Sequence, residues 1–194
     1  MNRFVETRVS DRLKGINIYL IGMMGAGKST VGKQVAQRLG YQFFDTDTVI
    51  EQLAGQSIPE LFVEMGEAGF RDLESRVLAE LSTYTRLVVA TGGGIILRQE
   101  NWGYLRYGVI AWLDVPLEQI QQRLQADTAR PLLQNGDLAS RLQTLMEQRR
   151  SLYAQADVHV GYEAGDTPEQ VAERVLLQVG QVLKPEPNTE DNGN

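Results

Sequence analysis

The sequence predicts an α/β protein built around a parallel β-sheet with helices on both faces. The first observation is that short apolar runs rich in β-branched residues alternate along the chain with longer segments of helical periodicity. The second is a glycine-rich phosphate-loop motif at residues 22–30, and the third is a run of three glycines at residues 92–94. In a parallel sheet both glycine-rich segments would meet at the carboxyl edge of the strands, where such folds bind ligands.

The first part of the chain contains two predicted strands separated by a helix. Residues 16–21 form an apolar stretch that ends at Gly22, which is typical of a buried strand. Residues 28–39 carry apolar side chains at helical spacing, and Gly40 ends this helix. A second, short strand is expected over residues 41–44.

The remaining elements continue this alternation. Residues 50–81 are expected to be mostly helical, with interruptions near Gly55 and Gly66. Further strands are expected over residues 87–90, 109–113 and 158–160. Further helices are expected from Pro116 onward, over residues 138–153 and over residues 167–183. We expect an N-terminal arm at residues 1–15, one domain at 16–183 with a mobile polar lid at about 126–136, and a disordered tail at 184–194.

Composition and charge exclude several classes of protein. Of the 194 residues 42% are hydrophobic and 23% charged, as in ordinary globular proteins. The chain contains no cysteine, which excludes disulfides, thiolate metal sites and cysteine nucleophiles. Its net charge of −6 argues against a general nucleic-acid binder. No apolar run is long enough to cross a membrane and no targeting segment is recognisable, so we expect a cytoplasmic protein.

A phosphate-binding loop is predicted between the first strand and the first helix. Its residues are Gly22-Met23-Met24-Gly25-Ala26-Gly27-Lys28-Ser29-Thr30, which match the pattern G-x-x-x-x-G-K-[ST]. Such a loop points backbone N–H groups and the positive end of a helix at a phosphate. We expect Lys28 to contact the β- and γ-phosphates of ATP and Ser29 to place its hydroxyl on Mg²⁺. The motif indicates nucleotide binding but does not separate GTPases, ATPases and small-molecule kinases.

Two acidic residues follow the second predicted strand. Asp45 and Asp47 would lie at the carboxyl edge of the sheet and face the phosphate site. Asp45 could hold a metal-bound water, and Asp47 could orient an acceptor hydroxyl or take its proton. Capping of a following helix is the alternative role for these residues, because aspartate is a common N-cap.

Basic residues and glycines later in the chain suit an anionic acceptor. The guanidinium of Arg71 could bind a carboxylate through two hydrogen bonds, or it could form a surface ion pair with Glu74. The run Gly92-Gly93-Gly94 favours close approach of the backbone to a ligand over simple loop flexibility. Arg130 could close over the transferring phosphoryl group, or it could be an ordinary solvated arginine.

Two further features near the end of the chain have less specific meanings. Arg149 and Arg150 end a predicted helix, where an arginine can also serve only to stabilise the helix C-terminus. The single histidine, His159, lies between two valines of a predicted strand, and we interpret it as structural.

In their order and spacing, these motifs resemble those of the shikimate kinases, of the nucleoside-monophosphate-kinase-like class. The resemblance runs from about residue 16 to residue 183 and rests on five segments after the phosphate loop. They are Asp45-x-Asp47, Gly66-Glu67-x-x-Phe70-Arg71-x-x-Glu74, the triple glycine, Arg130-Pro131-Leu132 and Arg149-x-x-Leu152-Tyr153. The resemblance implies a five-stranded parallel sheet flanked by helices on both faces, of the P-loop kinase type with a mobile lid, usually in a monomer.

The resemblance also implies a reaction. ATP, with Mg²⁺, would phosphorylate the 3-hydroxyl of shikimate to give 3-phosphoshikimate and ADP, in chorismate and aromatic amino-acid biosynthesis. Gly25, Ala26, Gly27, Lys28, Ser29 and Thr30 would bind the nucleotide, Arg123 would pack on the adenine, and Arg130 would contact the phosphates. Asp47, Arg71, Gly92, Gly93, Gly94 and Arg149 would bind shikimate, and Ser29 and Asp45 would hold the metal. We favour Arg149 over Arg150 because of its distance from the Leu152-Tyr153 pair.

Three rival functions are open at this point. A kinase for another small hydroxylated acid, such as gluconate, would share the phosphate loop, but the triple glycine and Phe70-Arg71 favour shikimate. A GTPase-type switch would normally carry an Asn-Lys-x-Asp segment, which the sequence lacks. A nucleic-acid-binding ATPase is disfavoured by the net charge of −6. We therefore expect in-line transfer catalysed by Lys28, Arg130 and Asp47, in a monomer that binds neither nucleic acid nor membrane.

Overall fold

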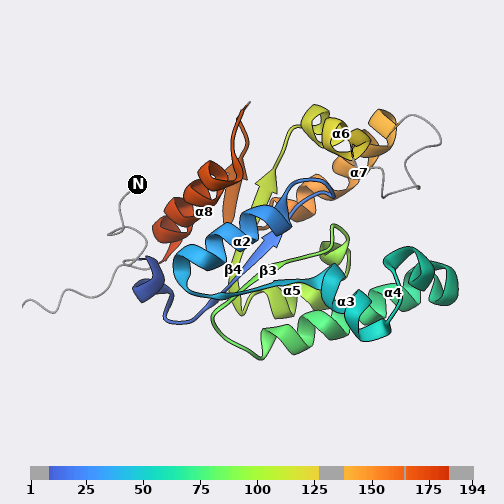
Figure 1. Ribbon diagram of the computed structural model, residues 1–194, viewed down its shortest axis with the longest axis horizontal. Coiled ribbons are helices and arrows are strands. Elements are labelled where there is room, and N and C mark those ends of the chain that lie inside the picture. The colour runs from blue at the N-terminus through green and yellow to red at the C-terminus, as the bar shows by residue number, and fades with distance from the viewer. Residues whose placement is uncertain (1–8, 127–137, 164, 184–194) are drawn as a thin grey trace, which may run out of the picture.

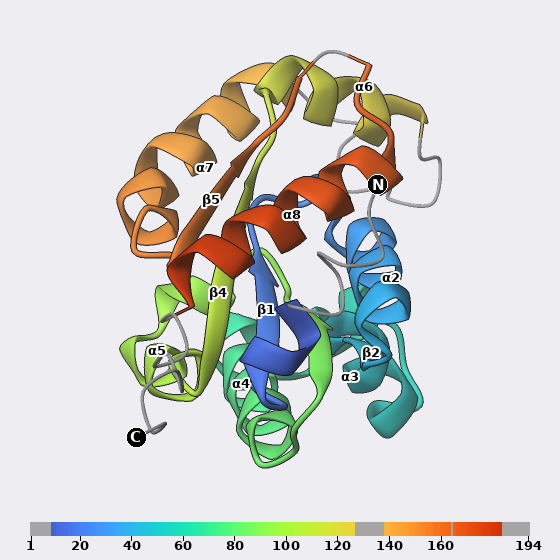
Figure 2. The same cartoon turned by 90° about the vertical axis from the view of Figure 1, so that its left-hand side faces the viewer.

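The computed structural model describes residues 9–126, 138–163 and 165–183, and within them five strands form one parallel sheet (Figures 1 and 2). The strands are β1 (Asn17–Ile21), β2 (Gln42–Asp45), β3 (Leu87–Ala90), β4 (Gly108–Asp114) and β5 (Val158–Gly161). They lie in the order β2-β3-β1-β4-β5, so that β1 pairs with β3 on one side and β4 on the other. The predicted α/β class and the five-stranded parallel sheet are confirmed.

Helices cover both faces of this sheet. They are α2 (Lys28–Leu39), α3 (Thr46–Ala54), α4 (Ile58–Ser82), α5 (Gln99–Leu105), α6 (Leu117–Ala126), α7 (Leu138–Tyr153) and α8 (Pro168–Val182), with a 3₁₀ turn η1 (Ile95–Leu97). Figure 2 shows α2 and α8, which contact each other, on one side of the central strands and α5 and α7 on the other. The phosphate loop and the loops after β2 and β3 therefore leave the same edge of the sheet, between these two helical layers.

The core lies where the central strands meet the helices. All five residues of β1 and all four of β3 are buried, as expected for parallel strands covered on both faces. Val31 and Val35 of α2 and Val175 of α8 are fully buried against them. Each such side chain contributes about 1.5–3 kcal/mol by leaving water. The strand ends that carry the glycine-rich loops are thus held by a rigid interior.

The helical segment predicted over residues 50–81 consists of two helices, α3 and α4, and it begins four residues earlier than predicted, at Thr46. α3 begins at Thr46 because the Asp45 side chain accepts hydrogen bonds from the backbone N–H groups of Asp47 and Thr48. The expected interruptions occur: Gly55 ends α3 with φ 67°, and Gly66 kinks α4 with φ 68° and ψ 178°. Both glycine conformations are costly for other residues.

Turn η1 and helix α5 were not among the predicted elements. The 3₁₀ turn has three residues and the helix seven, which is too short to show a clear apolar periodicity. Hydrogen bonds from side chains of α5 to backbone carbonyls of η1 join the two elements: Asn101 Nδ2 donates to the Ile95 carbonyl at 2.8 Å and Trp102 Nε1 to the Ile96 carbonyl at 3.0 Å.

The chain ends are only partly described. Residues 9–13 are helical, Leu13 is fully buried, and Arg12 donates hydrogen bonds to the Gly180 carbonyl at 2.8 Å and to the Leu183 carbonyl. Part of the expected arm is therefore packed against the end of α8. The expected lid, apart from Ala126, and the expected tail lie outside the described residues. No helix in the described part of the chain is both long and apolar enough to span a bilayer.

Candidate active site

The loop between β1 and α2 has the backbone of an anion-binding loop. Gly22, Gly25 and Gly27 adopt φ values of 141°, 73° and 88°, a region that residues with a Cβ rarely enter. At Gly22 an added Cβ would also lie 2.7 Å from the Leu113 carbonyl oxygen of β4. No side chain caps the N-terminus of α2, so its positive end faces the loop.

Lys28, the first residue of α2, is buried over the centre of this loop. Its side-chain ammonium donates to the carbonyl oxygens of Gly22 at 2.9 Å and Met23 at 2.8 Å. Ala26 is fully buried beside it, while Thr30 is exposed on the outer face of the helix. The one buried cation of the loop thus lies within the curl of the phosphate loop.

Asp45 caps α3, as the sequence allowed, and also contacts the phosphate loop. Its Oδ1 accepts from the backbone N–H of Asp47 at 3.0 Å and of Thr48 at 3.4 Å, which caps α3. Its Oδ2 accepts a hydrogen bond from the Ser29 hydroxyl at the start of α2. One carboxylate therefore joins the acidic loop to the phosphate loop.

The Ser29 hydroxyl and the Asp45 carboxylate are oxygen donors of the kind that Mg²⁺ prefers. Among the described residues no cluster of three or more His, Cys, Asp and Glu could enclose a metal ion. Two oxygen donors beside a phosphate loop fit a Mg²⁺ that keeps several waters and is held mainly by nucleotide phosphates.

The triple glycine leaves room for side chains of α3 and α4. A Cβ at Gly92 would lie 2.6 Å from Glu74 Oε1 and 2.8 Å from Asp47 Oδ1, and one at Gly94 would lie 2.6 Å from Arg71 Nη2. Side chains of Glu74, Asp47 and Arg71 therefore occupy the space that a Cβ at Gly92 or Gly94 would need. Gly92 is itself fixed by a hydrogen bond of 2.9 Å from its N–H to the Thr46 hydroxyl.

Arg71 and Glu74 form a buried pair, not the surface pair considered as an alternative. Arg71 Nη1 lies 2.5 Å from Glu74 Oε2, and the Glu74 side chain is only 2% exposed. Burial raises the pKa of Glu74, and the neighbouring Arg71 offsets part of that rise. The Arg71 guanidinium also lies 5.8 and 5.5 Å from the ring centres of Phe62 and Phe70, which restrict its orientation.

The structure distinguishes between the two arginines at the end of α7. Arg149 Nη1 donates to the Gly93 carbonyl at 3.1 Å, inside the site. Arg150 is exposed, and its guanidinium lies 5.9 Å from the ring centre of Trp112. His159 stacks on the same Trp112 at 4.4 Å and bonds Asp114 at 2.9 Å, which agrees with a structural role.

Arg123 lies on the other side of the phosphate loop. Its Nη1 donates to the Gly25 carbonyl at 3.2 Å, and its guanidinium lies 5.0 Å from the ring centre of Tyr162. A Cβ at Gly27 would be 3.5 Å from the Tyr162 hydroxyl. Burial raises the pKa of Tyr162, although Arg123 opposes this. An arginine and an aromatic ring therefore border the phosphate loop at Gly25 and Gly27.

Most of the expected site residues converge. The structure brings together Gly25, Ala26, Gly27, Lys28, Ser29, Asp45, Asp47, Arg71, Gly92, Gly93, Gly94, Arg123 and Arg149 around the two glycine loops. Arg130 lies outside the described residues. Sequence reasoning left Thr46, Glu74, Tyr153 and Tyr162 out of the site. Glu74 and Tyr153 do stand in the quoted motifs, whereas Thr46 and Tyr162 carried no signal.

Comparison with known proteins gives consistent matches over nearly the whole chain. A profile of the shikimate kinases matches residues 24–180. A shikimate kinase of Nostoc punctiforme is 54% identical over 178 residues, which are 92% of this chain and 98% of that protein. The structure of a shikimate kinase from Acinetobacter baumannii in complex with shikimate matches with TM-score 0.81 and 38% identity, over 91% of this chain and 99% of the other. A gluconokinase from Sinorhizobium meliloti shares only the fold, with TM-score 0.52 and 17% identity over 87% and 94% of the two chains.

Proposed function

The chain belongs to the shikimate kinase family, whose members transfer a phosphoryl group from ATP to shikimate, and on that premise we propose how this site performs the transfer. The observation that carries the proposal is the position of the triple glycine. Gly92 contacts the acidic groups, Gly93 lies against the phosphate loop, and Gly94 contacts Arg71. This loop would therefore bring the phosphates of ATP and the acceptor hydroxyl within reach of each other.

The nucleotide binds along the phosphate loop. In the free protein the Lys28 ammonium donates to the carbonyl oxygens of Gly22 and Met23. When ATP binds, Lys28 would contact the β- and γ-phosphate oxygens instead. Ser29 and Asp45 would hold Mg²⁺, which when bound would neutralise charge on the phosphates.

Groups on either side of the loop complete the nucleotide site. Arg123 supports the adenine from beside Gly25, and the neighbouring Tyr162 borders the same space. The role of Arg130 in binding the phosphates rests on the family resemblance alone. Charge stabilisation by such an arginine is commonly worth several kcal/mol in the transition state.

The acceptor binds on the opposite side of the triple glycine. Arg71 and Arg149 bind its carboxylate, and their places beside Gly94 and Gly93 support this because both cations then flank one site. Glu74, whose side chain is buried, holds Arg71 in its orientation through their ion pair. Asp47, next to Gly92, aligns the attacking hydroxyl and accepts its hydrogen bond. The enzyme acts as a cytoplasmic monomer with ATP and shikimate as its small-molecule partners.

Release of ADP from Mg·ATP, with and without shikimate and with gluconate as a control acceptor, tests this function. We expect rapid release with shikimate, slow release with gluconate, and little hydrolysis without an acceptor, because water is excluded from a filled site. Release with gluconate only would contradict the roles of Arg71 and Arg149. Release that ignores every acceptor would place the protein among ATPases or regulatory nucleotide binders.

Asp47→Asn tests the role of the carboxylate next to Gly92. The amide is isosteric but cannot take a proton, so we expect kcat to fall by about a hundredfold or more, with the KM for ATP little changed. Steady-state kinetics and thermal unfolding would be compared with Asp11→Asn, a change at an exposed aspartate of the helix at residues 9–13. A folded Asp47→Asn enzyme with near-normal kcat would remove Asp47 from the chemistry.

A further inference from the structure

The end of α7 contacts the triple glycine through two side chains, of which only one has a role so far. Arg149 and Tyr153 are four residues apart and therefore lie on the same face of the helix. Both donate to a single acceptor, the carbonyl oxygen of Gly93, at 3.1 Å from Arg149 Nη1 and 2.8 Å from the Tyr153 hydroxyl. A carbonyl oxygen has two lone pairs, so these two donors satisfy it completely.

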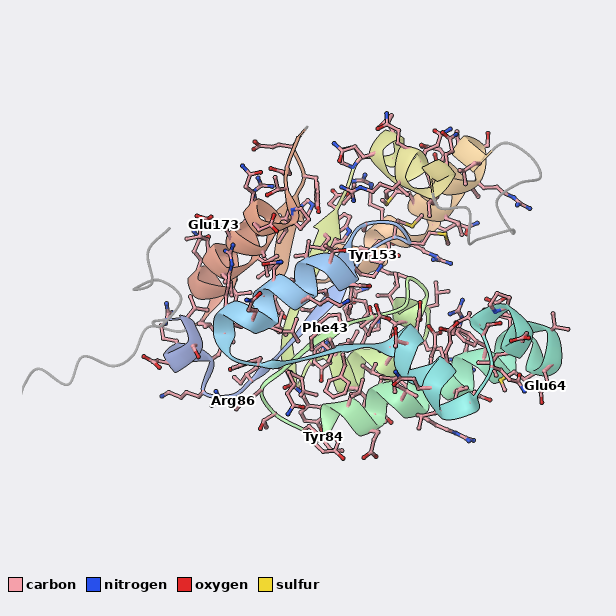
Figure 3. The ribbon with its side chains drawn as sticks, viewed as in Figure 1. Phe43, Glu64, Tyr84, Arg86, Tyr153 and Glu173 are labelled. Carbon is pink, nitrogen blue, oxygen red and sulfur yellow. The ribbon has the colours of Figure 1, made fainter. Side chains whose placement is uncertain are left out.

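Tyr153 is held rigidly in this position. Its side chain is fully buried, and its ring stacks on Trp112 of β4 with a centre-to-centre distance of 5.7 Å. Figure 3 shows it in the middle of the molecule, whereas Glu64 and Glu173 lie at the periphery. Burial raises the pKa of Tyr153 and outweighs the opposing effect of Arg149, so the hydroxyl keeps its proton and remains a donor.

Gly93 is the residue of the triple glycine that lies against the phosphate loop. A Cβ added there would be 3.3 Å from the backbone N of Met24 and 3.5 Å from the carbonyl oxygen of Gly22. The Gly93 backbone therefore has the phosphate loop on one side and α7 on the other. A small rotation of this peptide would change where Arg149 lies relative to the phosphate loop.

We propose that Tyr153 is a positioning residue that fixes the Gly93 carbonyl and, through it, the orientation of Arg149 toward the acceptor carboxylate. This role rests on the proposed function, because it presumes that Arg149 binds the acceptor. With Tyr153 occupying one lone pair, Arg149 gives one N–H to Gly93 and presents the remaining donors of its fork to the substrate. Without the hydroxyl, the carbonyl is free to turn and to draw the guanidinium away from the carboxylate.

Tyr153→Phe removes the hydroxyl and retains the buried ring. We expect the KM for shikimate to rise about tenfold, the size of a lost hydrogen bond in an ordered site, with kcat and the KM for ATP within about twofold of wild type. A merely structural role would not separate the two substrates in this way.

Tyr19→Phe is the matched control. Tyr19 is also fully buried and its hydroxyl accepts a hydrogen bond from Asn17 at 3.4 Å, but its ring packs beside Gly108 at the amino end of β4, away from the site. The control should lose a similar amount of stability and keep the KM for shikimate of the wild type. An equal rise of KM in both variants would overturn the proposal.

A double-mutant cycle with Arg149→Lys tests whether Tyr153 acts through Arg149. Lysine keeps the charge but loses the planar fork, so removing the Tyr153 hydroxyl from this background should change the KM for shikimate by less than about twofold. Effects that multiply, or a Tyr153→Phe protein that does not fold, would overturn the positioning role. An inactive wild type would instead remove the proposed function itself, whereas an active wild type with an unaffected Tyr153→Phe variant removes only this role.

Discussion

At the scale of single residues, Lys28 is the side chain on which phosphate binding most depends. Its side chain is buried, and its ammonium donates hydrogen bonds to two carbonyls of the phosphate loop, where an anion would bind. Lys28→Met keeps the aliphatic stem and removes the charge, and we expect kcat to fall by about a hundredfold or more. Steady-state ADP release measures this effect.

The matched control for this change is Lys33→Met on the same helix. Lys33 is exposed, and its ammonium lies 5.8 Å from the ring centre of Phe43. It should keep near-normal kinetics because it does not reach the loop. A Lys28→Met enzyme that matched the control would contradict the proposed phosphate contact.

Glu74 provides a second prediction at this scale, which concerns pH. Burial raises its pKa in the folded protein above the ordinary value of 4.5, so the folded state binds more protons than the unfolded state. The stability contribution of Glu74 is therefore fully present below pH 4.5 and declines as the pH rises through its folded pKa. Relative to wild type, Glu74→Gln should accordingly gain unfolding free energy as the pH is raised through this window.

Urea unfolding at a series of pH values measures this difference. Glu67→Gln is the control, because the Glu67 side chain is 70% exposed although it also lies 3.5 Å from Arg71. Its unfolding free energy should differ little from that of the wild type, because changes at exposed side chains usually have small effects on stability. A constant offset between Glu74→Gln and wild type across the series would show that Glu74 does not titrate differently on folding.

At the scale of elements, the triple glycine after β3 is the part of the fold that sets the acceptor site. Gly94→Ala would place a methyl group 2.6 Å from Arg71 Nη2, which must then move. We expect the KM for shikimate to rise about tenfold or more and the KM for ATP to stay within about twofold, since the phosphate loop is untouched. Initial-rate kinetics with each substrate varied in turn would measure both constants.

Gly103→Ala in α5 is the corresponding control. An added Cβ at Gly103 meets nothing within 4 Å, and alanine is the better helix former by about 0.5–1 kcal/mol. This variant should unfold at a slightly higher temperature and show unchanged kinetics. Equal kinetic damage in both variants would mean that loss of glycine, not contact with Arg71, is responsible.

At the scale of the whole molecule, the site lies at the carboxyl ends of the strands, whereas the helix at residues 9–13 and the end of α8 pack together near their amino ends. The helix at residues 9–13 precedes the amino end of β1, where Leu13 is fully buried and Arg12 bonds the Gly180 carbonyl of α8 at 2.8 Å. Leu13→Ala should lower the unfolding free energy by about 2–5 kcal/mol through loss of burial and the resulting cavity. The kinetic constants should be unchanged, because the hydrogen bonds of this helix go to the carbonyls of Leu39, Gly180 and Leu183, at the ends of α2 and α8 far from the site.

Denaturant unfolding together with steady-state kinetics would test this separation. Ile16→Ala is the control, since Ile16 is 41% exposed and its truncation should cost less than about 1 kcal/mol. Altered substrate constants in Leu13→Ala at a temperature where it is fully folded would show that the two edges of the sheet are coupled.

By itself the sequence determined the features that depend on near neighbours in the chain. The phosphate loop, the order of the strands and of the longer helices, and the breaks at Gly55 and Gly66 were predictable, because periodicity and turn chemistry act over a few residues. The family followed from the spacing of the motifs. Helix α5 was not predicted, since its seven residues are too few to show a clear apolar periodicity.

Only the tertiary structure decided which side chains meet. Arg149, and not Arg150, contacts Gly93, although Arg149 and Gly93 are 56 positions apart in the chain. The burial of Glu74 likewise depends on packing of α4. The hydrogen bond from the Tyr153 hydroxyl to the Gly93 carbonyl depends on packing of α7 against the loop after β3. Such contacts join segments distant in sequence, so their geometry, burial and electrostatics arise only when the sheet brings the strand ends together.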